Sequence, residues 1–463
     1  MRLPVTDAHT HIHRSASALL LIAQARRSLV QPLILCSTSE TDFDDVAALS
    51  SCSEFIVPNF GVHPWWASTA SPTLSEHLES RLIQSPGAGC GEIGLDASPR
   101  GILASPFEQQ VNVFKTQLSI ASKLQRPISV HCVQAYGPFL EALSESERNG
   151  EFLSGILMHS FAGTCGFANQ LIAQRGEGRG GKEKGGRGGG LSPLLFSFNG
   201  GVVSCASNAF DELRSKKDLS SSSPSSSTTT TKQDEEKKIF RARGLSKDSL
   251  KVLQRLSHSH LCFETDTPDQ PFLHHVSPSY LSWCRSVFGG EIDEEEAEDD
   301  DLGVTAEKES SCSILCCNDE PLQLQPSHDE TATSTSATST TSATSSSAGE
   351  GSLELYREKE KLAKENRPVL VRHVLRAAAI LRYSYGSRSS GLPLQIKPGA
   401  LAAEEVERKS TCPSDGLAFL AKEPESLPLD ITMGLRREYE ELCVSSTNNV
   451  KAMFQWAPKE FKV

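Results

Sequence analysis

Two histidines near the start of the sequence have the spacing of metal ligands. His9 and His11 lie in the run VTDAHTHIH (residues 5–13), whose composition is typical of a β-strand. Side chains on a strand alternate between its faces, so residues two apart point to the same face. Two imidazoles on one face make half of a metal site, although paired histidines at a strand end are also common surface residues. The interpretation therefore depends on whether later strands end in ligands too.

Four further potential ligands stand at the ends of later strand-like runs. Glu92 lies in GCGEIGLD (89–96), His131 ends ISVH (128–131), His159 lies in GILMHSF (155–161), and Asp266 lies in LCFETDTP (261–268). Imidazole and carboxylate ligands in this mixture suit Zn, Mn or Mg ions. Three or four protein ligands suffice for one ion, so six ligands predict two divalent metal ions that share a bridging residue. Glu92, from the strand opposite the histidine pair, is the natural bridge.

The elements that must position these residues alternate between strands and helices. Strand-like runs are expected at 5–13, 32–36, 54–60, 89–96, 128–131, 155–161, 194–203 and 261–268. Helical periodicity separates them at 16–28, 41–49, 73–83, 106–124, 136–144 and 246–257. Eight strands alternating with helices predict an α/β fold, the (β/α)8 TIM barrel, whose active sites lie at the carboxyl ends of the strands. The potential ligands fall at those ends.

Four segments interrupt this alternation. Residues 175–190 are rich in Gly, Arg and Lys, 207–243 contain a Ser/Thr tract, 289–351 combine an acidic run with Ser/Thr/Ala repeats, and 385–430 are rich in Pro and Gly. Their low apolar content is typical of disordered insertions. The sequence thus predicts one barrel domain over residues 1–463, interrupted by four long loops, with a core of roughly 300 residues.

Charge and cysteine content limit the class of protein. The net charge of -12 is concentrated in Glu291–Asp301, where nine of eleven residues are acidic. No strongly basic surface for nucleic acid is therefore evident in the composition. Thirteen cysteines without a disulfide framework or a secretory signal favour a reducing compartment. With no apolar run of membrane-spanning length, we expect a soluble intracellular protein of the cytoplasm or nucleus, with no membrane partner and a monomer as the favoured state.

The ordered motifs resemble those of the TatD family of metal-dependent deoxyribonucleases, in the amidohydrolase superfamily. The matching segments are DAHTHIH, GVHPWW, GEIGLD, PISVHC, HSFAG and ETDTP, with residues 446–454 similar to the closing helix of the family. The resemblance implies a divalent-metal phosphodiesterase acting on DNA, with His9, His11, Glu92, His131, His159 and Asp266 as metal ligands. It also implies that His63 contacts a substrate phosphate.

The chain departs from the family pattern at two places. His13 stands where the family commonly has Asp, and Val133 and Gln134 stand where it commonly has Arg and an acid. Losing that Arg removes a phosphate contact. The ligand set is complete, so the departures bear on the choice of substrate rather than on the metal chemistry.

The sequence predicts a deoxyribonuclease that acts as an exonuclease on single strands or free ends of DNA. Asp266 is expected to orient and deprotonate the attacking water, and Glu92 to bridge the ions. Trp65 and Trp66 are candidates for stacking on an unpaired base or for a hydrophobic plug at the rim of the barrel. Two other functions stay open: a metal-dependent hydrolase of another ester, an amide or an aminoacyl-tRNA bond, and a non-catalytic binding protein.

Overall fold

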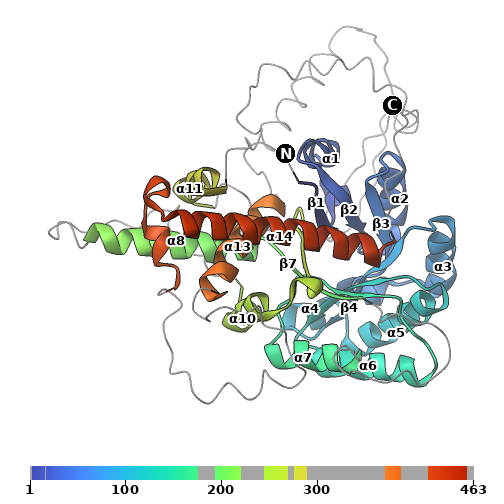
Figure 1. The fold of residues 1–463 in the computed structure, drawn as a ribbon. Helices are drawn as coiled ribbons and strands as arrows, with labels where there is room; N and C mark the ends of the chain where they lie inside the picture. Colours follow the sequence, from blue (N-terminus) through green and yellow to red (C-terminus); the bar gives the residue numbers. More distant parts are fainter. Residues whose placement is uncertain are drawn as a thin grey trace, which may run out of the picture. The chain divides into compact units, whose positions relative to one another are not determined.

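Eight parallel strands form one sheet whose strand order follows the sequence. The computed structural model describes residues 3–15, 17–175, 193–219, 245–269, 276–288, 371–386 and 416–455 (Figure 1). The strands are β1 (Val5–Thr10), β2 (Val30–Cys36), β3 (Ile56–Phe60), β4 (Gly89–Asp96), β5 (Ile128–Val133), β6 (Ile156–Met158), β7 (Leu194–Phe198) and β8 (Leu261–Phe263). Each strand lies within one of the eight runs predicted from the sequence, or overlaps it.

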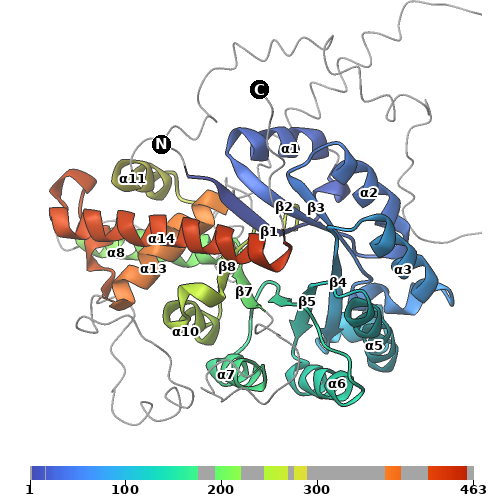
Figure 2. The same ribbon diagram turned by 45° about the vertical axis from the view of Figure 1, so that its right-hand side comes forward.

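The sheet closes into a barrel because the segment after β8 pairs with β1 and its extension. The backbone N–H of Asp266 donates to the carbonyl oxygen of His9 over 3.0 Å, and that of His11 donates to Thr267 over 2.7 Å. Figure 2 shows the strands at the centre with helices around them. The predicted (β/α)8 TIM barrel is confirmed.

Helices follow the strands and bury one face against them. They are α1 (Ala18–Arg27), α2 (Phe43–Ser51), α3 (Leu74–Gln84), α4 (Pro99–Ala104), α5 (Phe107–Lys123), α6 (Tyr136–Arg148), α7 (Cys165–Gln174), α8 (Gly201–Leu219), α10 (Lys247–Arg255), α11 (Pro278–Phe288), α13 (Val371–Gly386) and α14 (Leu429–Met453). In α5, Phe114, Leu118 and Ala121 recur at spacings of four and three and are fully buried. This spacing keeps them on one face of the helix, toward the sheet.

The end of α14 closes the amino-terminal end of the barrel. Val450, Met453 and Phe454 pack with inward-facing strand residues, namely Ala8, Ile34, Cys36, Val57, Leu157, Leu195 and Cys262. The fit is tight at the first residue of β4, since a Cβ added to Gly89 would lie 2.6 Å from the Phe454 ring. The carboxyl ends of the strands, where the candidate ligands lie, form the opposite end of the barrel.

One predicted strand was too long. The run expected as a strand over 194–203 ends at Phe198, and α8 begins at Gly201. The Asn199 side chain accepts a hydrogen bond from the Gly201 backbone N–H over 2.9 Å, as a helix cap does. Val202 and Val203 are therefore buried on a helix rather than on a strand.

The predicted insertions lie largely outside the described residues. Two of them overlap with described helices: residues 207–219 continue α8, and residues 416–430 include η7 (Ala418–Ala421), η8 (Pro424–Ser426) and the first residues of α14. Helix α13, between two predicted insertions, was not predicted. It is buried throughout residues 371–381 and packs against α8 and α14, which run beside it in Figures 1 and 2.

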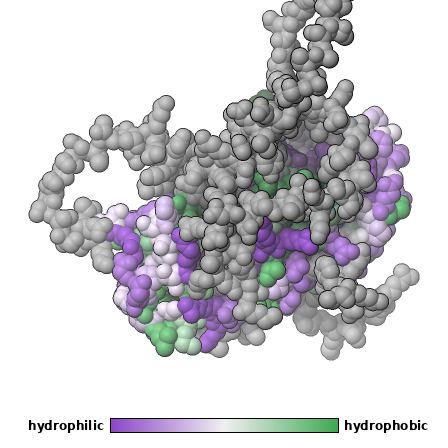
Figure 3. Space-filling model, turned by 90° about the horizontal axis from the view of Figure 1, so that it is seen from above, coloured by the Kyte–Doolittle hydropathy of each residue, from purple (hydrophilic) through white to green (hydrophobic). Residues whose placement is uncertain are grey.

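Exposed apolar side chains are scattered over the described surface. Leu103, Leu429 and Phe152 are the most exposed of them, at 88%, 72% and 64%. On the face drawn in Figure 3, apolar residues appear as separate patches among hydrophilic ones. Among the described helices, none has the length and apolar character needed to cross a membrane. None of the nine cysteines in the described ranges forms a disulfide.

Candidate metal centre

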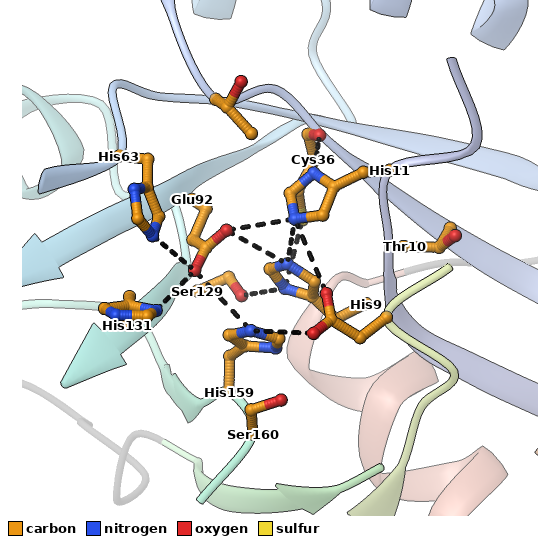
Figure 4. A network of polar contacts seen from close by, with 12 residues as sticks. His9, Thr10, His11, Cys36, His63, Glu92, Ser129, His131, His159 and Ser160 are labelled. Carbon is orange, nitrogen blue, oxygen red and sulfur yellow. Dashed lines mark hydrogen bonds and ion pairs between the residues drawn. The ribbon is translucent and has the colours of Figure 1, made fainter. Parts of the chain in front are cut away.

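All six predicted ligands meet at the carboxyl ends of the strands, and Figure 4 labels five of them, all but Asp266. His9 lies on β1, His11 just after it, Glu92 on β4, His131 on β5, His159 directly after β6, and Asp266 after β8. Five of the six are buried, and His131 is partly buried. The barrel topology thus gathers residues from the first strand to the last into one cluster.

Glu92 stands between two groups of histidines, as Figure 4 shows. Its Oε2 lies 3.0 Å from His11 Nε2 and 3.4 Å from His9 Nε2. Its Oε1 lies 3.1 Å from His131 Nδ1 and 3.6 Å from His159 Nε2. One carboxylate therefore offers one oxygen to each of two nitrogen pairs, which is the arrangement of a ligand shared by two ions.

Asp266 supplies a second carboxylate over the same two groups. Its Oδ1 lies 3.7 Å from His11 Nε2, and its Oδ2 lies 3.9 Å from His159 Nε2. The residue has φ of 53°, in the left-handed region that L-residues rarely adopt. Such backbone strain is most often retained at functional sites. The backbone hydrogen bond from Asp266 to His9 fixes the turn that directs the carboxylate into the cluster.

Each of the four histidines among the candidate ligands has its second nitrogen next to an oxygen that can accept a hydrogen bond. His11 Nδ1 donates to the Cys36 carbonyl oxygen over 2.7 Å, and His9 Nδ1 lies 2.9 Å from Ser129 Oγ. His131 Nε2 lies 3.3 Å from Asp96 Oδ2, and His159 Nδ1 lies 2.9 Å from Glu264 Oε1. An acceptor on one nitrogen places the proton there and leaves the other nitrogen free to bind a metal ion. The donor set therefore fits divalent cations.

His63 differs from these four histidines in the ring nitrogen that carries the proton. Its Nδ1 accepts a hydrogen bond from the Trp65 backbone N–H over 3.1 Å, so the neutral ring carries its proton on Nε2. That Nε2 lies 3.5 Å from Glu92 Oε1. Although His63, Glu92 and His131 lie close enough to hold an ion, this tautomer makes His63 a hydrogen-bond donor toward the cluster rather than a ligand.

Two acidic residues of the centre were missed by the sequence analysis. Glu264 is fully buried and accepts hydrogen bonds from the Ser160 backbone N–H and hydroxyl, each over 2.9 Å, and from the Ser197 hydroxyl. Asp96 ends β4 and accepts from Trp65 Nε1 over 2.6 Å. Both lie in quoted motifs, GEIGLD and ETDTP, and an acid two residues from Asp266 or four residues from Glu92 was the available signal. They orient His159 and His131.

The electrostatics of the cluster favour bound cations. Burial acts to raise the pKa of Glu92, but the surrounding histidines hold it well below its usual range. Burial acts to lower the pKa of His131 and His159, but the neighbouring carboxylates raise them to about 9 and about 10. Burial raises the pKa of Asp266 to about 6. Protons on the histidines thus balance the buried carboxylates, a balance that metal ions would also provide.

His13, at one of the departures from the family pattern, does not join the cluster as a ligand. Its Nε2 lies 3.1 Å from Asp42 Oδ2. Asp42 also accepts hydrogen bonds from the backbone N–H groups of Thr38 and Ser39. His13 therefore ties η1 (Ile12–Arg14) to the loop after β2.

A second group of potential ligands, His258, Glu438 and Glu441, lies at the start of β8 and on α14. Arg382 Nε donates to Glu438 Oε1 over 2.7 Å, which places a guanidinium on the carboxylate that an ion would need. His258 Nε2 lies 3.0 Å from the same oxygen. This group is an ion-pair network that joins α13, α14 and η4 (His258–His260).

Comparison with known proteins finds similarity to one family over part of the chain. The model of the family described as TatD related DNase matches residues 6–178, which hold five of the six predicted ligands, with Asp266 beyond them. The Cut9-interacting protein scn1 of Schizosaccharomyces pombe is 28% identical over 202 residues, covering 30% of this chain and 58% of that protein. The 3'-5' ssDNA/RNA exonuclease TatD of Cronobacter sakazakii is 29% identical over 154 residues, covering 33% of this chain and 56% of that protein.

The chain spans a little over half the length of these relatives. Among solved structures, the TatD homolog YJJV from Escherichia coli k12 is similar with a TM-score of 0.41 and 18% sequence identity. That similarity covers 58% of this chain and 82% of the other.

Proposed function

We propose that this chain, which belongs to the TatD-related DNase family, is a divalent-metal-dependent hydrolase that cleaves phosphodiester bonds of DNA. The observation that carries the proposal is the position of Glu92, whose two carboxylate oxygens face two separate pairs of imidazole nitrogens. A bridge of this kind suits two divalent ions, for which Mg, Mn and Zn are the candidates.

Divalent ions at such a centre supply Lewis acidity toward a phosphodiester oxygen and a nucleophilic water at neutral pH. Among the residues of the chain, Asp266 spans both ligand groups and is suited to orient the attacking water and accept its proton. His63 presents Nε2–H toward Glu92 and is suited to donate a hydrogen bond to a phosphate oxygen. Glu92 holds the two ligand groups at a fixed separation.

We infer that the substrate is single-stranded DNA or a free DNA end, cut as by an exonuclease. The centre lies at the mouth of a barrel, and five of its six candidate ligands are buried. A strand paired in a duplex presents its phosphates on a convex surface, whereas a single strand or an end can enter a recessed mouth. The relative from Cronobacter sakazakii is named as an exonuclease on single-stranded DNA and RNA, which supports this choice.

The proposal extends to the setting of the enzyme. We propose an intracellular protein of the cytoplasm or nucleus that acts as a monomer on DNA. The nine described cysteines without disulfides support a reducing compartment. The single barrel assembles the whole ligand set within one chain, which supports activity without a second copy.

The test combines metal analysis with hydrolysis. The purified protein is expected to contain one to two divalent ions per chain and to degrade a labelled single-stranded oligonucleotide faster than its duplex, with EDTA abolishing turnover. Glu441→Ala, in the second group of acids and histidine, serves as a control that leaves both results unchanged. A protein that contains no metal, or that cleaves small esters or aminoacyl-tRNA while leaving oligonucleotides intact, contradicts the proposal.

A further inference from the structure

The rim beside the metal centre holds an arginine stacked on a tryptophan. Trp65 belongs to η3 (Pro64–Thr69), and Arg100 belongs to α4. The guanidinium carbon of Arg100 lies 4.1 Å from the centroid of the Trp65 ring, within the range of a cation–π contact. Arg100 is exposed, and no carboxylate of the described residues forms an ion pair with it. Its N–H groups are therefore available to an anionic ligand.

Both residues are held in place by the carboxylate that anchors a metal ligand. Trp65 Nε1 donates to Asp96 Oδ2 over 2.6 Å, and the same oxygen lies 3.3 Å from His131 Nε2. Helix α4 packs on Asp96 so closely that a Cβ added to Gly101 would lie 2.5 Å from its carboxyl carbon. The position of Arg100 is thus fixed relative to the metal centre.

The stacked pair lies next to the centre rather than elsewhere on the rim. The Trp65 ring centroid is 5.0 Å from that of His63 and 6.4 Å from that of His131. The guanidinium of Arg100 therefore lies one aromatic ring away from two histidines of the centre. This separation suits the phosphate that follows or precedes the one being cleaved in a polynucleotide.

Three other described positions near the mouth do not offer the same free charge. Arg14, after β1, is paired with Asp269, whose Oδ2 lies 2.9 Å from Arg14 Nη1. Val133 and Gln134, which follow His131, carry no charge. A guanidinium that stacks on an aromatic ring keeps its planar edge free, and that edge fits the oxygens of a phosphate.

We propose that Arg100, held flat on Trp65, binds the backbone phosphate next to the scissile phosphodiester of the DNA strand. This inference rests on the proposed function and adds a substrate-binding residue to it. Arg100 contributes to binding of the strand and not to the chemical step, because it lies outside the ligand cluster. Trp66, the next residue of η3 after Trp65, is 43% exposed.

The test compares Arg100→Gln with the parent protein in EDTA, where turnover does not interfere. Binding of a fluorescent single-stranded oligonucleotide is measured by anisotropy over a range of salt concentrations. The substitution is expected to weaken binding roughly fivefold, as the loss of one exposed ionic contact does. It should also reduce the slope of log K against log salt by about 0.7, the value for one phosphate contact with a single strand. Arg100→Lys, which keeps the charge, should keep the slope.

Arg148→Gln is the matched control. Arg148 is an exposed arginine in the last turn of α6. Because α6 leads to the start of β6, Arg148 lies toward the amino-terminal end of the barrel, away from the metal centre. It should leave affinity and slope unchanged. With metal present, Arg100→Gln should raise KM for oligonucleotides and leave hydrolysis of bis(p-nitrophenyl) phosphate unchanged, because that ester has no neighbouring phosphate.

The outcomes separate this inference from the proposed function. Equal slopes for Arg100→Gln and the parent protein overturn the inference, and so does an equal loss for Arg148→Gln. A fall in bis(p-nitrophenyl) phosphate hydrolysis also overturns it, because Arg100 would then act on the metal centre through Asp96. A parent protein that binds oligonucleotides but hydrolyses neither substrate contradicts the proposed function alone, and one that binds no oligonucleotide contradicts both.

Discussion

Replacing Glu92 by Gln should remove one of the two metal ions that the proposed centre would hold. Glutamine keeps the length and shape of the side chain but offers one oxygen, and its NH2 group cannot bind a cation. In the structure one carboxylate oxygen faces His9 and His11, and the other faces His131 and His159. The amide oxygen can serve one pair, so the other pair loses its shared ligand. Glu92→Ala removes both oxygens and should loosen both ions.

The effect on turnover follows from the loss of one ion. A metal ion that polarises a phosphoryl oxygen contributes several kcal/mol of transition-state stabilisation. A loss of about 3–4 kcal/mol corresponds to a fall in kcat of roughly 10²–10³-fold. The fall should persist at saturating metal, because the missing ligand cannot be restored by mass action at accessible concentrations.

Elemental analysis of the dialysed protein measures the stoichiometry, and single-turnover hydrolysis of an oligonucleotide measures the rate. Glu438→Gln provides the control, since Glu438 also contacts a histidine and lies outside the centre. It should leave the metal content at the parent value. Two ions per chain in Glu92→Gln would refute the bridging role and assign the ions to separate, unshared ligand sets.

Three further predictions concern individual side chains. Asp266→Asn should lower kcat roughly 10²–10⁴-fold, the usual contribution of a positioned base, and should lose less metal than Glu92→Ala. Single-turnover rates within about threefold of the parent rate would show that Asp266 does not accept the proton. His63→Ala should keep the full metal content and impair hydrolysis, because His63 faces the centre as a hydrogen-bond donor. If the variant binds fewer ions than the parent protein, His63 is a metal ligand instead. Glu438→Gln should lower stability by about 1–2 kcal/mol. Burial acts to raise the pKa of Glu438, but His258 and Arg382 hold it below its usual value. The stability that Glu438 contributes is therefore present above the ordinary carboxyl pKa near 4.5. It is lost as the pH falls through the lower pKa that Glu438 has in the folded protein. In urea melts, the stability difference between parent and variant should stay constant from pH 7 to about 5 and narrow below that; a difference that grows on acidification would contradict the assignment.

The gathering of the six candidate ligands was predictable because the parallel barrel places the carboxyl ends of distant strands on one face. His9 and Asp266 come from the first and last strands, yet a backbone hydrogen bond joins them. Nothing more than strand order and the position of each polar residue at a strand end was needed for that prediction.

The residues that orient the ligands were not predictable in the same way. Glu264 and Asp266 are two residues apart, and strand alternation would place both on the same face. In the structure β8 ends at Phe263, and the left-handed backbone of Asp266 turns its carboxylate to the metal ligands while Glu264 lies behind His159. Which of two acids faces the centre depends on a backbone angle that residue types do not specify.

Helix α13 was missed for a different reason. Residues 371–381 are all buried, and Arg372, His373 and Arg376 are among them, so the polar residues of this helix do not mark a solvent-exposed face. Arg372 within it donates to the carbonyl oxygens of Leu3 and Ser28. Those partners are distant in sequence, and local pattern alone cannot supply them.

Five histidines surround Glu92, and what separates their roles is the atom that contacts the second ring nitrogen. Acceptors from Ser129, Cys36, Asp96 and Glu264 hold four of the rings with a free nitrogen toward the centre. At His63 the partner is a backbone donor, because Pro64 starts η3 and brings the Trp65 N–H back onto the ring. The same turn carries Trp65 to Asp96 and so fixes the indole on which Arg100 lies. One short 3-10 turn therefore makes His63 a donor, helps to orient His131 through Asp96, and sets the position of the arginine at the rim.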